Sequence, residues 1–245
     1  MKLPELKEMM EAGMHFGHMP SKWNPKMSKY IFGVRNNVHI FDLEKTIETL
    51  ARALGVVKST VANGGVVLFL GTKKQARWIV EEQAKNVVMP YIVEHWIGGT
   101  ITNFVEIHKL VKKLEILEKR SADLDYEKKY TKWERSQFAK EIEKLNKNIG
   151  GIRYMKKIPD LVYIVGIKDE KTAVAEARVK GVKTVGIVDT NADPDDVTYP
   201  IAANDDAIKS ITMITKLVAQ AVEEGKGEVS IASAEKPIEQ KEKNN

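Results

Sequence analysis

Short apolar runs alternate with amphipathic stretches along most of the chain. The runs 66–70 (VVLFL), 161–165 (LVYIV) and 184–188 (TVGIV) have the length and continuity of strands that are buried on both faces. A fourth strand is expected at 91–93. Apolar residues at helical spacing predict helices from residue 73, from 170 to 180 and from 206 to 224. This order predicts an α/β fold, flavodoxin-like or Rossmann-like, with a parallel sheet flanked by helices.

Turn-forming residues mark a separate hairpin near the N-terminus. The apolar runs 30–34 and 38–41 are joined by Arg35-Asn36-Asn37, and asparagine tolerates the left-handed backbone of a tight turn. A β-hairpin is therefore predicted here. Asp42 is expected to cap a helix that runs to about Ala62, as Asn204-Asp205 is expected to cap the helix from 206.

The segment 104–149 differs from the rest of the chain because it lacks proline and glycine and is rich in Lys and Glu. Two apolar stripes recur at spacings of three and four, formed by Ile107, Leu110, Leu114 and Leu117 and by Phe138, Ile142, Leu145 and Ile149. On an isolated helix each apolar stripe would be exposed to solvent. An antiparallel coiled-coil hairpin, in which the two stripes pack together, is therefore predicted. At about 1.5 Å per residue, it would project roughly 25 Å.

The chain is thus expected to have three parts. An α/β domain is formed by 1–103 and 150–225, and 104–149 is a hairpin inserted into it. The segment 226–245 has few large apolar residues and balances its lysines against glutamates, so a disordered tail is predicted.

Composition excludes several classes of protein. The chain has 43% hydrophobic and 30% charged residues, which is typical of a folded protein, and no cysteine. Disulfides, thiolate nucleophiles and cysteine-based zinc or iron–sulfur sites are therefore excluded. No apolar stretch is long enough to span a membrane, and charged residues interrupt the N-terminal segment where a signal peptide would need an apolar core. We therefore expect a cytoplasmic protein that does not contact membranes.

The positive charge is concentrated in two stretches without acidic residues. The chain has 34 acidic residues and a net charge of +5, yet 12–41 and 49–80 contain neither Asp nor Glu. The first stretch interleaves cations with Trp23, Tyr30 and Phe32. Phosphates attract cations that have no competing carboxylate, and flat rings can stack on bases. The pattern indicates nucleic-acid binding, although buried aromatic residues and solvated lysines are the alternative.

Two glycine-containing loops are further candidates. Gly71-Thr72-Lys73-Lys74 follows a predicted parallel strand, where α/β proteins usually bind ligands, but it lacks the glycine spacing of a P-loop or a dinucleotide fingerprint. A plain tight turn explains it equally well. Loop 96–103 (WIGGTITN) could allow close approach of a sugar-phosphate backbone, or it could form a turn that caps the next helix.

Candidate metal ligands and catalytic residues give weaker signals. His15 and His18 have a spacing at which two imidazoles can share a metal, and His39 could be a third ligand, but hydrogen-bonded structural histidines are favoured. Segment 189–193 (DTNAD) starts like a calcium loop but is better explained as a turn whose carboxylates accept local N–H groups. The chain contains no serine elbow, HExxH helix or kinase signature, so neither an enzyme nor a cofactor is predicted.

Several motifs together resemble the bacterial form of the small-subunit ribosomal protein two family. In chain order they are 13–18 (GMHFGH), 23–27 (WNPKM), 30–32 (YIF), 38–43 (VHIFDL), 69–75 (FLGTKKQ), 96–104 (WIGGTITNF), 150–152 (GGI), 157–160 (KIPD), 189–191 (DTN) and 204–206 (NDD). The chain departs from the family pattern at His95, where arginine is usual. It also departs at Gly166, where aspartate is expected, and at Ala202-Ala203, which replaces Pro-Gly.

The resemblance implies an α/β domain with a protruding coiled coil that binds small-subunit rRNA near the head–body junction. It also implies contacts with other small-subunit ribosomal proteins, recruitment of the first of them, and a monomer within the ribosome. No small-molecule substrate is expected. The rival hypothesis is an α/β enzyme that binds a nucleotide or sugar phosphate around Gly71, Gly98 and Asp189.

The predicted rRNA-facing surface joins the N-terminal basic segment, the turn after the first strand of the sheet, and the second glycine loop. Its residues are Lys22, Trp23, Asn24, Lys26, Lys29, Tyr30, Arg35, Thr72, Lys73, Lys74, Arg77, Trp96, Gly98, Gly99, Thr100, Thr102 and Asn103.

Overall fold

The computed structural model describes residues 2–123 and 125–235. Its centre is a sheet in which every neighbouring pair of strands is parallel, in the order β4-β3-β5-β6-β7. The strands are β3 (Val67–Leu70), β4 (Tyr91–Ile92), β5 (Leu161–Val165), β6 (Lys183–Val188) and β7 (Tyr199–Ala202). The predicted parallel α/β fold is confirmed, and the strands predicted at 66–70, 161–165 and 184–188 all lie within one residue of their expected bounds.

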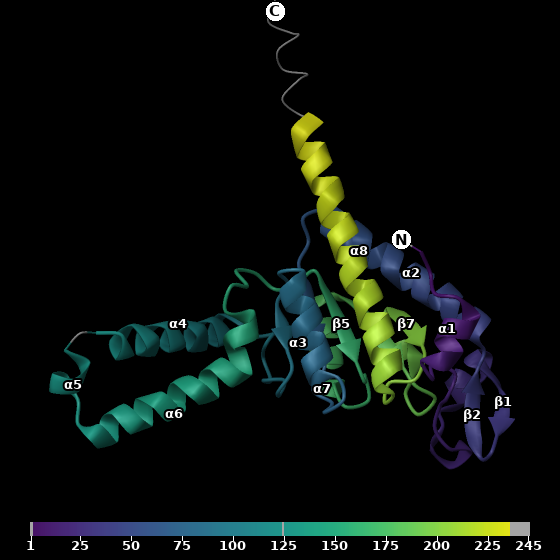
Figure 1. Cartoon of the computed structure of the whole chain (residues 1–245), viewed down its shortest axis with the longest axis horizontal. Coiled ribbons are helices and arrows are strands. Elements are labelled where there is room, and N and C mark those ends of the chain that lie inside the picture. The colour runs from purple at the N-terminus through teal and green to yellow at the C-terminus, as the bar shows by residue number, and fades with distance from the viewer. Residues whose placement is uncertain (1, 124, 236–245) are drawn as a thin grey trace, which may run out of the picture.

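Helices cover both faces of the sheet because side chains alternate in direction along each strand. One face carries α2 (Leu43–Ala62), α3 (Arg77–Asn86) and α8 (Ile208–Glu235), and the other carries α7 (Lys171–Lys180) (Figure 1). Within β3, Val67 and Phe69 belong to the first core, whereas Leu68 and Leu70 belong to the core beneath α7. The unbroken apolar sequence of the strand therefore reflects burial on both faces.

The N-terminal hairpin forms a separate two-stranded sheet. Its strands are β1 (Ile31–Arg35) and β2 (Val38–Phe41). Asn36 and Asn37 join them with φ values of 49° and 59°, which is the left-handed backbone of a tight hairpin turn, so the predicted hairpin is confirmed. Ahead of the hairpin come α1 (Leu6–Glu11) and two 3-10 helices, Pro20–Lys22 and Pro25–Tyr30, which the sequence patterns did not predict.

A helical arm projects from one side of the sheet (Figure 1). It consists of α4 (Phe104–Ser121) and α6 (Lys132–Ile149), between which the chain reverses around α5 (Tyr126–Lys129). On α4 the buried apolar residues are Ile107, Val111, Leu114 and Leu117, so Val111 takes the place that the predicted stripe gave to Leu110. No helix among the described residues, these two included, combines the length and apolarity needed to cross a membrane.

Two helix boundaries differ from the prediction. α3 begins at Arg77 rather than Lys73 because the chain first makes a turn, fixed by hydrogen bonds from Thr72 to Glu170. α8 begins two residues late, after Asn204 caps the backbone N–H groups of 206 and 207, and it continues to Glu235. The tail was predicted to start at 226, and this is wrong for 226–235, because extending an existing helix is much easier than nucleating one. The rest of that predicted tail, 236–245, lies outside the described residues.

β7 was not predicted because Pro200 lies within it. Proline cannot donate a backbone hydrogen bond, so it argues against a strand in the middle of a sheet. β7 is an edge strand, where one side of the backbone needs no neighbour, and the proline is tolerated there.

Candidate nucleic-acid interface

The basic N-terminal segment is anchored to the loop that follows β6. The backbone N–H of Asn24 donates to the Thr190 carbonyl at 2.7 Å, and that of His18 donates to the Thr190 hydroxyl at 2.8 Å. A Cβ on Gly17 would lie 2.6 Å from the Thr190 side chain, so only glycine allows this approach. The predicted cations of the segment are therefore presented from a fixed backbone.

These cations divide into one that is paired and three that are not. Lys26 Nζ lies 2.8 Å from Asp193 and 2.9 Å from Asp195, and hydrogen bonds to these carboxylates raise the pKa of Lys26. Its charge is therefore balanced within the chain. The other three have exposed side chains and no carboxylate within ion-pair distance in the described parts of the chain; they are Lys22, Lys29 and Arg35.

The aromatic side chains of the segment differ in accessibility. The ring of Trp23 lies 5.1 Å from that of His39 and is still 37% exposed. Tyr30 is half-buried, with Lys29 Nζ 5.0 Å from its ring centre. Phe32, which is 81% exposed, offers a free aromatic face on β1. Asn24 has a local role, because its side chain accepts the Lys26 backbone N–H at 3.0 Å and caps a 3-10 helix.

The turn after β3 uses most of its polar groups inside the chain. The Thr72 N–H and hydroxyl donate to Glu170 Oε1 at 3.1 and 2.5 Å, and burial raises the pKa of that carboxyl group although these hydrogen bonds act against the shift. Lys73 Nζ lies 2.7 Å from Asp205 and 2.9 Å from Asp206. Together these contacts leave little of the turn free to hold a phosphate.

Lys74 lies in the same turn and Arg77 is the first residue of α3, and the two differ in their ion pairing. Arg77 donates to Glu94 at 2.9 Å and to the Thr72 carbonyl at 2.8 Å. Lys74 is exposed and, within the described residues, has no carboxylate partner. Of the predicted cations in this turn, only Lys74 is therefore available to a polyanion.

The second glycine loop wraps around a carboxylate of the chain itself. Glu176 on α7 accepts hydrogen bonds from the Trp96 indole at 3.0 Å, from the Gly99 N–H at 2.7 Å, and from the N–H groups of residues 101 and 102 at 2.9 and 3.1 Å. The Thr102 hydroxyl also donates to it, at 3.1 Å. Burial acts to raise the pKa of Glu176, but the Trp96 and backbone hydrogen bonds outweigh it and lower the pKa.

The loop therefore resembles an anion-binding site, and the anion that it binds is the Glu176 carboxylate of the same chain. Trp96 and Thr100 are buried, and Thr100 donates to the carbonyl of residue 97 at 2.6 Å. Gly98 and Asn103 are exposed, and the Asn103 side chain does not cap α4. The predicted turn before α4 is present, but the donors of the loop serve Glu176 rather than the helix cap. Its exposed residues, Gly98 and Asn103, stay predicted contacts with rRNA.

The three candidate histidines do not come together. The His39 ring is buried beside Trp23, and that of His15 lies 3.9 Å from the Phe16 ring. His18 instead lies between Asp189 and Asp206, where hydrogen bonding and the charge of Asp189 raise its pKa against the effect of burial. A site formed by all three histidines is therefore excluded.

Sequence reasoning missed the acidic residues that organise this region. Asp189 and Asp205 are both 1% exposed, and Glu176 is 7% exposed. The predicted turn at 189–193 is correct in that Asp189 accepts the Thr190 N–H and Asp193 accepts the Asp195 N–H. The burial of Glu176 could have been predicted from the sequence, because it lies between Ala173 and Ala177 on the apolar side of its helix.

Comparisons with known proteins agree on one family. The model of the family described as ribosomal protein S2 matches residues 9–225. The small ribosomal subunit protein uS2 of Fusobacterium nucleatum is 45% identical over 225 residues, covering 92% of this chain and 91% of that protein. Its namesakes from Thermobifida fusca and Wolinella succinogenes are each 46% identical, cover 90% of this chain, and are covered over 75% and 81% of their length. The chain therefore belongs to the ribosomal protein S2 family.

Proposed function

We propose that this chain is a structural constituent of the small ribosomal subunit and binds its rRNA near the head–body junction. Members of the ribosomal protein S2 family are structural proteins and not enzymes. The enzyme hypothesis also loses its chemical basis, since Thr72 and Lys73 are engaged with buried carboxylates rather than open to a small phosphate.

One observation carries the proposal: the anchored N-terminal basic segment presents cations that no carboxylate neutralises. Lys22, Lys29 and Arg35 are free among the described residues, while the nearby Lys26 is paired. Phe32 adds an exposed ring on β1, which suits stacking on an unpaired base. Unpaired cations gain most from phosphate binding because they have no internal salt bridge to break.

The helical arm fits a role in protein docking. We propose that α4 and α6 form an antiparallel coiled coil, joined by the Lys113–Glu141 ion pair and by the apolar stripe of α4. Near its tip the rings of Tyr126, Tyr130 and Phe138 cluster, and Trp133 is 71% exposed. Such an arm suits contacts with neighbouring ribosomal proteins, and recruitment of the first small-subunit protein belongs to the same proposal.

The double variant Lys22→Glu/Lys29→Glu should lower incorporation into small subunits. Reversing two unpaired charges places carboxylates against phosphates and should weaken rRNA binding on the order of tenfold at physiological salt. The measurement is the fraction of tagged full-length chain that sediments with small subunits, together with its affinity for the rRNA.

The matched control is Lys180→Glu/Lys183→Glu, which makes the same change in net charge. Both lysines are exposed at the amino end of β6, the opposite end of the sheet from the turn after β3. This control should incorporate normally. Equal incorporation of the two double variants would reject the N-terminal basic segment as the rRNA-binding surface.

A further inference from the structure

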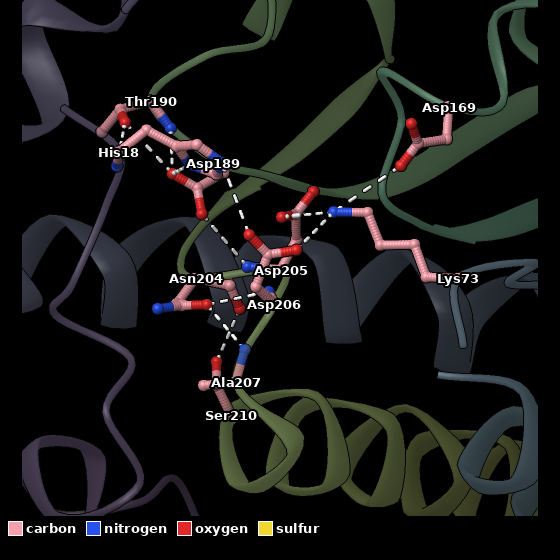
Figure 2. Close-up of polar contacts among 10 residues, drawn as sticks. All are labelled: His18, Lys73, Asp169, Asp189, Thr190, Asn204, Asp205, Asp206, Ala207 and Ser210. Atoms are coloured by element: carbon pink, nitrogen blue, oxygen red, sulfur yellow. Dashed lines mark hydrogen bonds and ion pairs between the residues drawn. The ribbon is translucent and has the colours of Figure 1, made fainter. Parts of the chain in front are cut away.

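His18 lies between two aspartates at the carboxyl end of β6 (Figure 2). Its Nδ1 atom is 3.0 Å from Asp189 Oδ1, and its Nε2 atom is 3.4 Å from Asp206 Oδ2. One nitrogen of His18 and one oxygen of each aspartate lie within 4.8 Å of one another. Among the described residues, no other group of His, Asp and Glu side chains gathers its donor atoms at the spacing of metal ligands.

Hydrogen bonding accounts for only one side of this imidazole. Nδ1 faces Asp189 Oδ1 at 3.0 Å, which is hydrogen-bond distance. The 3.4 Å separation of Nε2 from Asp206 Oδ2 exceeds the roughly 2.7–2.9 Å of a charge-assisted hydrogen bond. Nε2 thus faces a carboxylate without a good hydrogen bond to it.

The same separation suits two ligands of one small cation. Zinc binds histidine nitrogen at about 2.0–2.1 Å and carboxylate oxygen at about 2.0–2.2 Å. At a tetrahedral angle, two such ligands lie about 3.3–3.5 Å apart. Nε2 and Oδ2 already have this spacing.

Asp189 is fixed in a place from which it can orient the ring. Its Oδ1 accepts the Thr190 N–H at 2.5 Å and the Thr190 hydroxyl at 3.1 Å, and its Oδ2 accepts the Asp205 N–H at 3.3 Å. A metal on Nε2 would leave the Nδ1–H for this carboxylate, which is the usual way in which metal-binding histidines are oriented.

The surroundings can supply a further ligand and access from solvent. His18 and Asp206 line an open cleft of about 460 Å³ together with Asn191. The Asn191 side-chain oxygen is buried and has no hydrogen-bond partner in the described part of the chain. Because Asn191 lines the same cleft as the two candidate ligands, this oxygen is available as a third ligand.

The local charge also favours a cation. The ammonium group of Lys73 faces three carboxylates, at 2.7 Å from Asp205, 2.9 Å from Asp206 and 3.6 Å from Asp169. Asp189 adds a fourth carboxylate on the far side of His18. When His18 is neutral, as a metal ligand must be, one lysine cannot balance these carboxylates, and a divalent ion would offset the excess negative charge.

We propose that this group binds one divalent transition-metal ion of the zinc class. His18 Nε2 and Asp206 Oδ2 are direct ligands, the Asn191 side-chain oxygen is the third, and Asp189 is a positioning residue. An imidazole ligand selects zinc over magnesium, which prefers oxygen alone. The site does not depend on rRNA binding, and the two proposals can fail separately.

The test is calorimetric titration of the metal-free full-length chain with ZnCl2. One ion should bind per chain, and His18→Gln or Asp206→Asn should each weaken binding at least tenfold. The control His15→Gln, a histidine in the same segment but outside the group, should bind like the natural chain. MgCl2 should bind far more weakly than ZnCl2.

A second measurement needs no substitution. Co²⁺ added to the natural chain should give a visible absorption band that Zn²⁺ abolishes, and circular dichroism should verify that each variant is folded. The proposal is overturned if the natural chain binds no Zn²⁺ at saturation, if folded His18→Gln keeps full affinity, or if Mg²⁺ binds equally well.

Discussion

Replacing Glu176 with alanine is expected to lower the free energy of unfolding by about 3–5 kcal/mol. The carboxylate accepts the Trp96 indole N–H, backbone N–H groups of the loop and the Thr102 hydroxyl, at 2.7–3.1 Å. Alanine would leave the Trp96 indole and the N–H of residue 101 without an acceptor in the interior, while the donors of Gly99 and Thr102 are only partly buried. Urea unfolding monitored by circular dichroism gives the change.

The pH dependence of the milder variant Glu176→Gln identifies the charge as the cause. The folded pKa of Glu176 lies below its ordinary value, so the ionised carboxylate stabilises the fold above that ordinary value. This stabilisation is lost as the pH falls through the lower folded pKa. The stability difference between the natural chain and Glu176→Gln should therefore be constant above about pH 5 and shrink below it.

The control for both Glu176 variants is Glu143→Ala. Glu143 is an exposed acid on α6, and its loss should change the free energy of unfolding by no more than about 0.5 kcal/mol. If Glu176→Ala is as stable as Glu143→Ala, the loop is not held by this carboxylate.

Lys73 and Lys74 should differ in their contribution to the free energy of unfolding when each is replaced with methionine. Lys73→Met is expected to lower the free energy of unfolding by about 3–5 kcal/mol, because it removes the counter-ion of Asp205, which is 1% exposed. Lys74→Met should leave the stability within about 0.5 kcal/mol, since Lys74 is exposed and unpaired among the described residues.

The same two variants should also differ in their affinity for rRNA and in its salt dependence. Lys74→Met should weaken binding and reduce the slope of log affinity against log salt by about 0.7–0.9, the amount for one phosphate contact. Lys73→Met, measured under conditions where it is folded, should keep the natural slope. A reduced slope for Lys73→Met with unchanged stability would show that Lys73 faces the RNA and that its internal ion pairs are unimportant. Unfolding and binding should both be measured in metal-free buffer.

The parts of the fold that were predicted correctly have local causes. Asn36 and Asn37 specify the hairpin because few other residues adopt their positive φ values, and Asp42 specifies the start of α2 by accepting the Glu44 N–H. Continuous apolar strands identified the parallel sheet, because only burial on both faces selects such a sequence. The start of α3 and the presence of β7 were missed, since both depend on neighbours distant in sequence.

The candidate site was only partly predictable for the same reason. Residues 12–41 contain no acid, yet Lys26 is paired with Asp193, which lies 167 positions away along the chain. Lys73 meets Asp205 across 132 positions. A stretch without carboxylates in sequence is therefore not a surface without carboxylates in space. The candidate cations that stayed free are Lys22, Lys29, Arg35 and Lys74, which are exposed and have no carboxylate partner among the described residues.

The most direct test is crosslinking of the full-length chain to rRNA within purified small subunits, with the crosslinked residues identified by mass spectrometry. Crosslinks are expected on the N-terminal basic segment 22–35 and at Lys74, in subunits that carry the natural chain. Subunits in which these positions stay free of crosslinks, while other faces of the α/β domain crosslink efficiently, would contradict an rRNA-binding role for the unpaired cations.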